Sequence, residues 1–186
     1  MKKTLQIIKT KEFVILATIF VVILIYVLFF KPNPKIRVDL NKLRGIEPVS
    51  ALTIEAPDEI DGVGKNFLVE IRLNTQNNYV NAVQSYLIFD SNVLEVVKTD
   101  TTNSFCKFYP ENVFSNISGY VKLSCGTPYP GFNGTNKVQV IEFYPKAIKN
   151  TTLSLSGESM VLANDGKGTN LLRDLPNKEI KIKAGL

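Results

Sequence analysis

The sequence predicts an all-β domain, a jelly-roll β-sandwich of about nine strands, preceded by one N-terminal transmembrane helix. From Val49 onward, apolar residues recur at every second position in short runs separated by Gly, Asn, Asp and Pro. No long 3.6-residue period follows residue 48, whereas Phe13 to Phe30 is one uncharged apolar run. We therefore expect four parts: a cytoplasmic basic tail (1–12), a transmembrane helix (13–30), a linker (31–47) and a β-sandwich domain (48–186).

The run from Phe13 to Phe30 is long enough to cross a lipid bilayer as a helix. Eighteen residues at about 1.5 Å each span roughly 27 Å, close to the thickness of the hydrocarbon core. A cleaved secretory signal is the alternative, but such a signal ends in small residues. This run ends in Leu28-Phe29-Phe30, and Pro32 stops the helix. We therefore expect an uncleaved anchor.

Positive charge is concentrated around this apolar run. Residues 1–44 carry nine Lys/Arg and two Asp/Glu, a net charge of +7, whereas residues 45–186 carry thirteen and fifteen, a net charge of −2. Basic flanks suit anionic lipid headgroups, and the slightly acidic remainder argues against a nucleic-acid partner. Large domains translocate largely regardless of flanking charge. The expectation is a single-pass membrane protein whose C-terminal domain is extracytoplasmic, at the cell surface or in the periplasm.

Period-two patterns give the expected strands of the domain. Phe67, Val69, Ile71 and Leu73 form one apolar face of a strand, and the stretch around Val83 alternates in the same way. Asp61 to Gly64, Gly126 to Asn136 and Asn164 to Gly166 are predicted as turns or loops. The predicted extended segments are 51–56, 67–73, 80–90, 93–98, 105–108, 112–117, 120–125, 137–144, 151–155, 158–162 and 178–183.

Cys106 and Cys125 are the only cysteines in the sequence. In an exported domain such a pair is expected to form a disulfide that closes a loop of about twenty residues, worth about 3 kcal/mol in the loop-entropy model. Two unpaired buried thiols are the alternative.

The composition argues against catalysis. The absence of histidine removes the commonest general base and metal ligand, and no two carboxylates stand in a suggestive context. Asp165 next to Gly166 is a lone carboxylate, which favours a tight turn over a calcium loop. We therefore predict no catalytic residue, no cofactor and no metal site.

Several segments, in their order along the chain, resemble the cohesin domain, a jelly-roll sandwich related to some carbohydrate-binding modules. The run from Val80 to Val96, in which Phe89-Asp90 precedes a turn and Val93-Leu94-Glu95, carries most of the resemblance. Weaker matches are 66–73, 131–134, 140–143 and 161–168. The resemblance implies a dockerin-like or other protein partner, bound through one sheet face. The outward positions that it implies are Ala82, Gln84, Tyr86 and Ile88, with Tyr120 and Lys122 on a later strand.

Other interpretations of the sequence stay open. Val138, Val140 and Tyr144 are also expected to point outward, either as part of a binding face or under a second layer of packing. A carbohydrate-binding module that contacts polysaccharide through Tyr79, Tyr129 or Phe132 is an alternative, and an aromatic plug over the sandwich edge is the structural explanation for the last two. A third alternative is a structural subunit of a surface filament or membrane complex.

Overall fold

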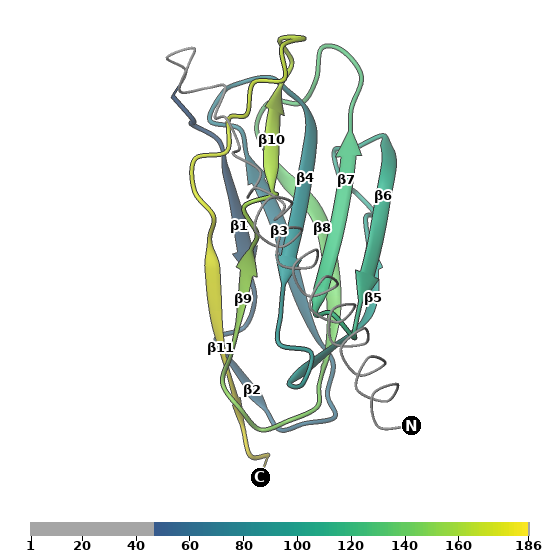
Figure 1. Ribbon diagram of the computed structural model, residues 1–186, viewed down its shortest axis with the longest axis vertical. Helices are drawn as coiled ribbons and strands as arrows, with labels where there is room; N and C mark the ends of the chain where they lie inside the picture. The colour runs from purple at the N-terminus through teal and green to yellow at the C-terminus, as the bar shows by residue number, and fades with distance from the viewer. Residues whose placement is uncertain (1–46, 186) are drawn as a thin grey trace, which may run out of the picture. The chain divides into compact units, whose positions relative to one another are not determined.

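The computed structural model describes residues 47–185, which form eleven β-strands (Figure 1). The strands are β1 (Ala51–Glu55), β2 (Glu59–Asp61), β3 (Phe67–Asn74), β4 (Val80–Ile88), β5 (Leu94–Asp100), β6 (Phe108–Ser115), β7 (Tyr120–Gly126), β8 (Thr135–Pro145), β9 (Thr151–Leu155), β10 (Met160–Ala163) and β11 (Asn177–Lys183). The predicted tail, transmembrane helix and most of the linker lie outside these residues. Within residues 47–185, no helix has the length and apolar character needed to cross a membrane.

The strands form two sheets that pack face to face, which confirms the predicted all-β sandwich. The smaller sheet has the order β1-β3-β8-β5, and the larger has the order β2-β11-β9-β4-β7-β6, with β10 also paired to β4. The larger sheet faces the viewer in Figure 1. Alternate residues of the central strands point between the sheets and are fully buried, among them Ile71, Leu87, Leu123 and Phe143. This alternation follows from the two-residue repeat of a pleated strand.

Strand β4 lies at the centre of the larger sheet because later strands pair with both of its edges. Along one edge, β7 pairs antiparallel from Ala82↔Gly126 to Ile88↔Tyr120. The other edge is shared: β10 pairs with the first half of β4 and β9 with its last two residues. The outer surface of β4 is therefore flanked by strands on both sides.

Three details of the strand prediction were wrong. The two segments expected at 105–108 and 112–117 are one strand, β6, and residues 105–107 are not part of it. Asp61 belongs to β2, a three-residue strand that pairs parallel to β11, rather than to a turn. Such a short strand carries too little alternation to be recognised in the sequence.

The third error concerns β8, where Val138 was expected to point outward. The pairing of β3 with β8 shifts register after Ile71, so that Val138 and Gln139 are both buried. Such an irregularity inserts one residue and disturbs the inside–outside alternation. Val140 and Tyr144 do point outward, but β8 belongs to the smaller sheet. They therefore share no face with Tyr86 and Ile88.

The predicted disulfide between Cys106 and Cys125 is confirmed. Their Cα atoms lie 5.8 Å apart, and the bond joins the chain just before β6 to the end of β7. Next to it, the buried Phe105 ring stacks on Phe132 with ring centroids 4.4 Å apart. The disulfide thus attaches the edge strand β6 and the preceding loop to the sheet.

Candidate binding face

The six residues expected on the binding face lie together on the outer surface of the larger sheet. Ala82, Gln84, Tyr86 and Ile88 alternate along β4 with the buried side chains of the core. In the pairing with β7, Tyr86 lies opposite Lys122, and Ile88 lies opposite Tyr120. Residues opposite each other in an antiparallel pair point to the same side of the sheet, so these side chains form neighbouring rows.

One end of this face is aromatic. The rings of Tyr86 and Tyr120 meet edge to face with centroids 5.6 Å apart, and the Lys122 ammonium lies 5.8 Å from the centre of the Tyr86 ring. Lys122 also forms an ion pair with Glu111 of β6, with 3.3 Å between Nζ and Oε2. These contacts hold the two tyrosines in place, and Ile88 beside them stays exposed.

A row of polar side chains crosses the middle of the face. Gln84 donates a hydrogen bond from Nε2 to the carbonyl of Glu158 at 2.8 Å. The Ser124 hydroxyl lies 3.3 Å from Gln84 Oε1 and 3.1 Å from Glu111 Oε2, and its single proton serves one of them at a time. The row fixes the Gln84 amide and links β4, β7 and β6 across the sheet.

The other end of the face is an apolar groove of about 210 Å³. The groove lies over β4 and β7, between β10 and β6, and its apolar lining includes Ala82, Phe108, Pro110, Met160 and Leu162. The Phe108 ring lies over Gly126, where an added Cβ would stand only 2.3 Å from a ring carbon. Glycine at this position therefore lets the ring form one wall of the groove.

Four of these groove residues were not anticipated from the sequence. Phe108 and Pro110 come from β6, and Met160 and Leu162 come from β10. Their strands lie next to β7 and β4 through pairings between distant segments, such as Met160 with Gln84. Alternation within a strand indicates which residues point outward, but it does not indicate which strands are neighbours.

The three candidate sugar-stacking residues differ in how far their side chains are exposed to solvent. Tyr129 is 89% exposed and Tyr79 is 54% exposed. Phe132 is half-buried, because its ring stacks on Phe105 and its backbone exchanges two hydrogen bonds with Val80. One face of the Phe132 ring is thus occupied by the domain itself, as expected for an aromatic plug.

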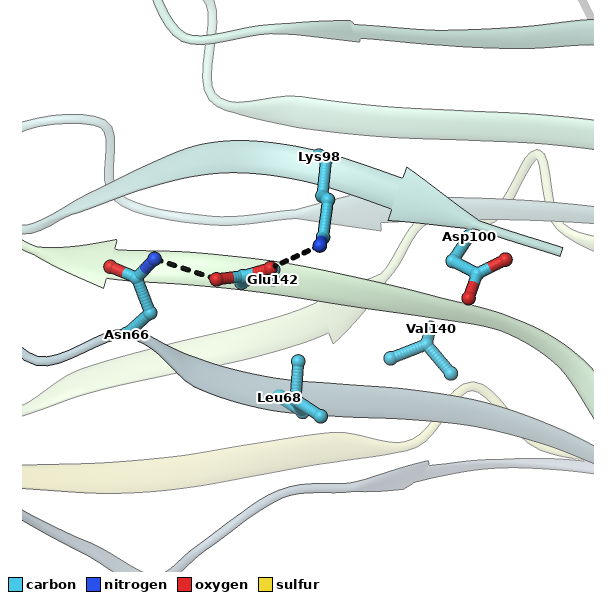
Figure 2. A pocket seen from close by; sticks show the side chains of 6 residues that line it. All are labelled: Asn66, Leu68, Lys98, Asp100, Val140 and Glu142. Atoms are coloured by element: carbon cyan, nitrogen blue, oxygen red, sulfur yellow. Dashed lines mark hydrogen bonds and ion pairs between the residues drawn. The ribbon is translucent and has the colours of Figure 1, made fainter. Parts of the chain in front are cut away.

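The outer surface of the smaller sheet has a different character (Figure 2). A hollow of about 450 Å³ there is lined by Asn66, Leu68, Lys98, Asp100, Val140 and Glu142. Glu142 accepts a hydrogen bond from Asn66 at 2.6 Å and forms an ion pair with Lys98 at 3.1 Å. The hydrogen bond from Asn66, aided by Lys98, lowers the pKa of Glu142 below its ordinary value. The charged groups of this hollow are thus largely satisfied by one another.

Asp165 takes part in the structure of its own turn. Its carboxylate accepts hydrogen bonds from the Lys167 backbone N–H and the Thr169 hydroxyl. These bonds, led by that of Thr169, lower the pKa of Asp165. Among residues 47–185, no three His, Cys, Asp or Glu side chains gather as metal ligands would.

Solved structures with the same fold are cohesin modules. The cohesin module of a family 33 glycoside hydrolase from Clostridium perfringens is 19% identical, with a TM-score of 0.62 over 74% of this chain and 98% of that one. A non-cellulosomal cohesin from Archaeoglobus fulgidus is also 19% identical, with a TM-score of 0.52 over 72% and 92%. A cohesin from Acetivibrio cellulolyticus, solved in complex with a dockerin, is 12% identical, with a TM-score of 0.58 over 73% and 99%.

No family model matches the sequence, and no curated protein matches it. At identities of 11–19% the likeness to the solved structures establishes the fold. Residues 47–185 therefore have the fold of a cohesin module.

Proposed function

We propose that this chain is a non-catalytic, membrane-anchored module that binds a protein partner outside the cytoplasm. The partner docks on the outer face of β4, β7, β6 and β10, which we call the docking face. Its residues are Ala82, Gln84, Tyr86, Ile88, Phe108, Pro110, Tyr120, Lys122, Met160 and Leu162. A dockerin or a dockerin-like module is the expected partner.

The observation that carries this proposal is the low charge of the docking face together with its exposed aromatic and apolar side chains. Strand β4 carries no charged residue, and the face has one ion pair, between Lys122 and Glu111, among the described residues of β4, β6, β7 and β10. Interface centres are depleted in charged residues and enriched in Tyr, Phe and Met. The cohesin from Acetivibrio cellulolyticus was solved with a dockerin bound, which supports a protein partner of this class.

The arrangement of the face suggests how a partner is bound. The groove of about 210 Å³ is smaller than typical small-molecule pockets of roughly 300–1,000 Å³, so it suits an inserted apolar side chain better than a free ligand. The Gln84 row then supplies hydrogen bonds beside the groove, and the two tyrosines provide rigid contact area at the other end. Tyrosines of this kind dominate the energy of many interfaces.

Anchoring follows from the apolar run at residues 13–30, which is proposed to cross the bilayer once. The domain then lies in an oxidising compartment, where the Cys106–Cys125 disulfide persists. An anchor confines the domain to a surface and raises the effective concentration of a partner held there.

The proposal is tested with the full chain in detergent and a panel of dockerin modules, beginning with those encoded in the same genome. We expect at least one to bind, and the double variant Tyr86→Asp with Ile88→Asp to abolish that binding. The matched control is Leu68→Asp with Val140→Asp on the opposite sheet, which is expected to bind normally. If the first variant still binds the dockerin, the partner does not dock on this face. If no dockerin in the panel binds the wild-type chain, this partner class is excluded.

Carbohydrate binding is the second candidate, favoured by the exposed rings of Tyr79 and Tyr129. A glycan array probed with the same chain distinguishes the two. Saccharide binding that Tyr129→Ala removes, and that the docking-face variant leaves intact, would favour the carbohydrate interpretation.

A further inference from the structure

The described strands include five edge strands: β1 and β5 in the smaller sheet, β2 and β6 in the larger, and β10, which pairs with no strand but β4. An edge strand offers backbone N–H and C=O groups to any further strand. Proteins block such edges with charges, prolines, bulges, short strands or covering chain. Four of these five edges are blocked in one of these ways, that of β10 by the segment 169–171, where the Leu171 N–H donates to the Val161 carbonyl at 2.7 Å.

Chain and charge block the edges at β1 and β2. The segment around Leu171 runs along the start of β1, where the Val49 and Ser50 N–H groups donate to the Leu171 carbonyl at 2.9 and 2.8 Å. Strand β2 has only three residues, and two of them, Glu59 and Asp61, are acidic. Neither strand offers a long apolar edge.

A side chain blocks the edge at β5. The Asn116 amide accepts a hydrogen bond from the Val96 N–H at 2.8 Å and donates one to the Val96 carbonyl at 2.9 Å. The amide therefore occupies the position that a backbone partner would take. Lys98 and Asp100 add charge along the same strand.

Strand β6 is protected only in its first half, by Pro110 and a register shift, and residues 111–115 have neither. It is eight residues long and lies at the right-hand margin of the sheet in Figure 1, with no strand of residues 47–185 on its outer side. Phe108, Val113 and Phe114 are 52%, 45% and 41% exposed. Its one charged residue, Glu111, is paired with Lys122 of the neighbouring strand β7. An edge segment left open in this way is a template for adding a strand.

We propose that the added strand is β6 of a second copy of this chain, paired antiparallel with Val113 opposite Val113. In this register Glu111 faces Ser115, and Asn112 faces Phe114, so no like charges meet, and Val113 and Phe114 of each copy lie in the interface. Pro110 lacks an N–H, and the β6–β7 pairing shifts register between Phe108 and Glu111, which confines the new pairing to 111–115.

This dimer orients the docking faces. Residues opposite each other in an antiparallel pair point to the same side, so the two-fold axis stands perpendicular to the joined sheet. Both docking faces then point in the same direction. If the proposed function holds, the dimer captures two partner modules side by side, with the gain in avidity that linked sites provide.

Cross-linking tests the register. In the full chain in detergent, Val113→Cys places two thiols directly opposite, with Cβ atoms about 4.5–5.5 Å apart, and we expect a disulfide-linked dimer on mild oxidation. Ser115→Cys is the matched control, because its two copies are displaced by four residues, or roughly 13 Å. Equal cross-linking of the two variants, or none with Val113→Cys, would overturn the proposal.

Sedimentation equilibrium tests the association without cross-linking. A pairing of five residues is small, so we expect a weak dimer that forms at chain concentrations on the order of 100 µM. In the variant Val113→Glu, the two introduced carboxylates lie opposite each other across the two-fold axis, so the dimer is expected to be lost. Within each copy the new carboxylate lies beside Lys122. Mixing Val113→Glu with Val113→Lys should restore a heterodimer. The proposed interface is contradicted if the wild-type chain stays monomeric, or if the mixture of the two variants does. Both outcomes are independent of the result with the dockerin panel.

Discussion

In both sheets, buried and outward-pointing residues alternate along the strands, but the outward-pointing side chains of the two sheets differ. On the smaller sheet, Glu142 is held by Asn66 and Lys98, and Arg72 forms ion pairs with Glu55 and Glu70. On the larger sheet, the central strand carries no charge, and apolar side chains surround a groove.

The charged outer face suits contact with water, and the largely uncharged outer face suits contact with a partner. Charges that satisfy one another across strands keep a sheet face soluble and leave little to gain from covering it. A face with exposed aromatic and apolar side chains gains free energy when water is removed from it. The proposed docking face is therefore distinguished by its contrast with the opposite face, more than by any single residue.

The largest expected effect comes from removing the disulfide, which stabilises only the larger sheet directly. Cys106→Ser with Cys125→Ser is expected to lower the free energy of unfolding by about 3 kcal/mol, because the unfolded chain regains loop entropy. Urea unfolding measures the total loss. Hydrogen exchange should show β6 and β7 losing protection before β3 and β8; a uniform loss would contradict the local role of the disulfide.

Filling the groove is expected to have the next largest effect. Ala82→Trp places a ring where the partner's apolar side chain is proposed to insert, so the affinity for a captured dockerin should fall about tenfold to a hundredfold, equivalent to about 1.4–2.7 kcal/mol. Calorimetry measures the loss. Leu68→Trp, in the hollow of the opposite face, is the control and should leave the affinity unchanged; equal losses would remove the distinction between the faces.

A smaller effect on stability is expected from removing a buried polar pair between the two sheets. There Gln139 of β8 donates a hydrogen bond to the Ser85 hydroxyl of β4 at 3.4 Å. Within the described residues, Gln139 Oε1 is buried without a hydrogen-bond partner. Replacing both polar groups, with Gln139→Met and Ser85→Ala, should therefore raise the free energy of unfolding by about 1 kcal/mol. Ser85→Ala alone leaves the Gln139 amide without its acceptor and should be destabilising. A destabilised double variant would show that Gln139 is satisfied in solution.

The smallest effect concerns the acid sensitivity of the charged face. The folded-state pKa of Glu142 lies below its ordinary value of 4.5, so the stability that this carboxylate contributes is present above that value and is lost as the pH falls through the folded-state pKa. Glu142→Gln should therefore flatten the decline in stability below about pH 4.5, measured by urea unfolding at several pH values. Its affinity for a dockerin should not change. A steeper decline in the variant would contradict the assignment.

The sequence predicts which residues of a strand point inward and which point outward, but it does not predict which strands pair with one another. The outward set on β4 follows from its two-residue period, as does the inward set with Leu87. The groove depends on Met160 and Phe108, whose strands reach β4 and β7 through pairings that leave no local pattern. Val138 shows the limit within one strand, because a single register shift reverses its direction. The resemblance to cohesins supplied the face that periodicity alone did not select.

The central position of β4 has a consequence for the order in which the domain assembles. Its three partners, β7, β9 and β10, all come later in the sequence, and the last of them ends at Ala163. During synthesis from the N-terminus, β4 therefore emerges well before any of its partners and has exposed edges until they arrive. Such distant pairings make folding slow, and the unpaired strand is open to association with other chains. The same uncharged strand that makes a good docking face is thus the segment most exposed to aggregation while the domain is being made.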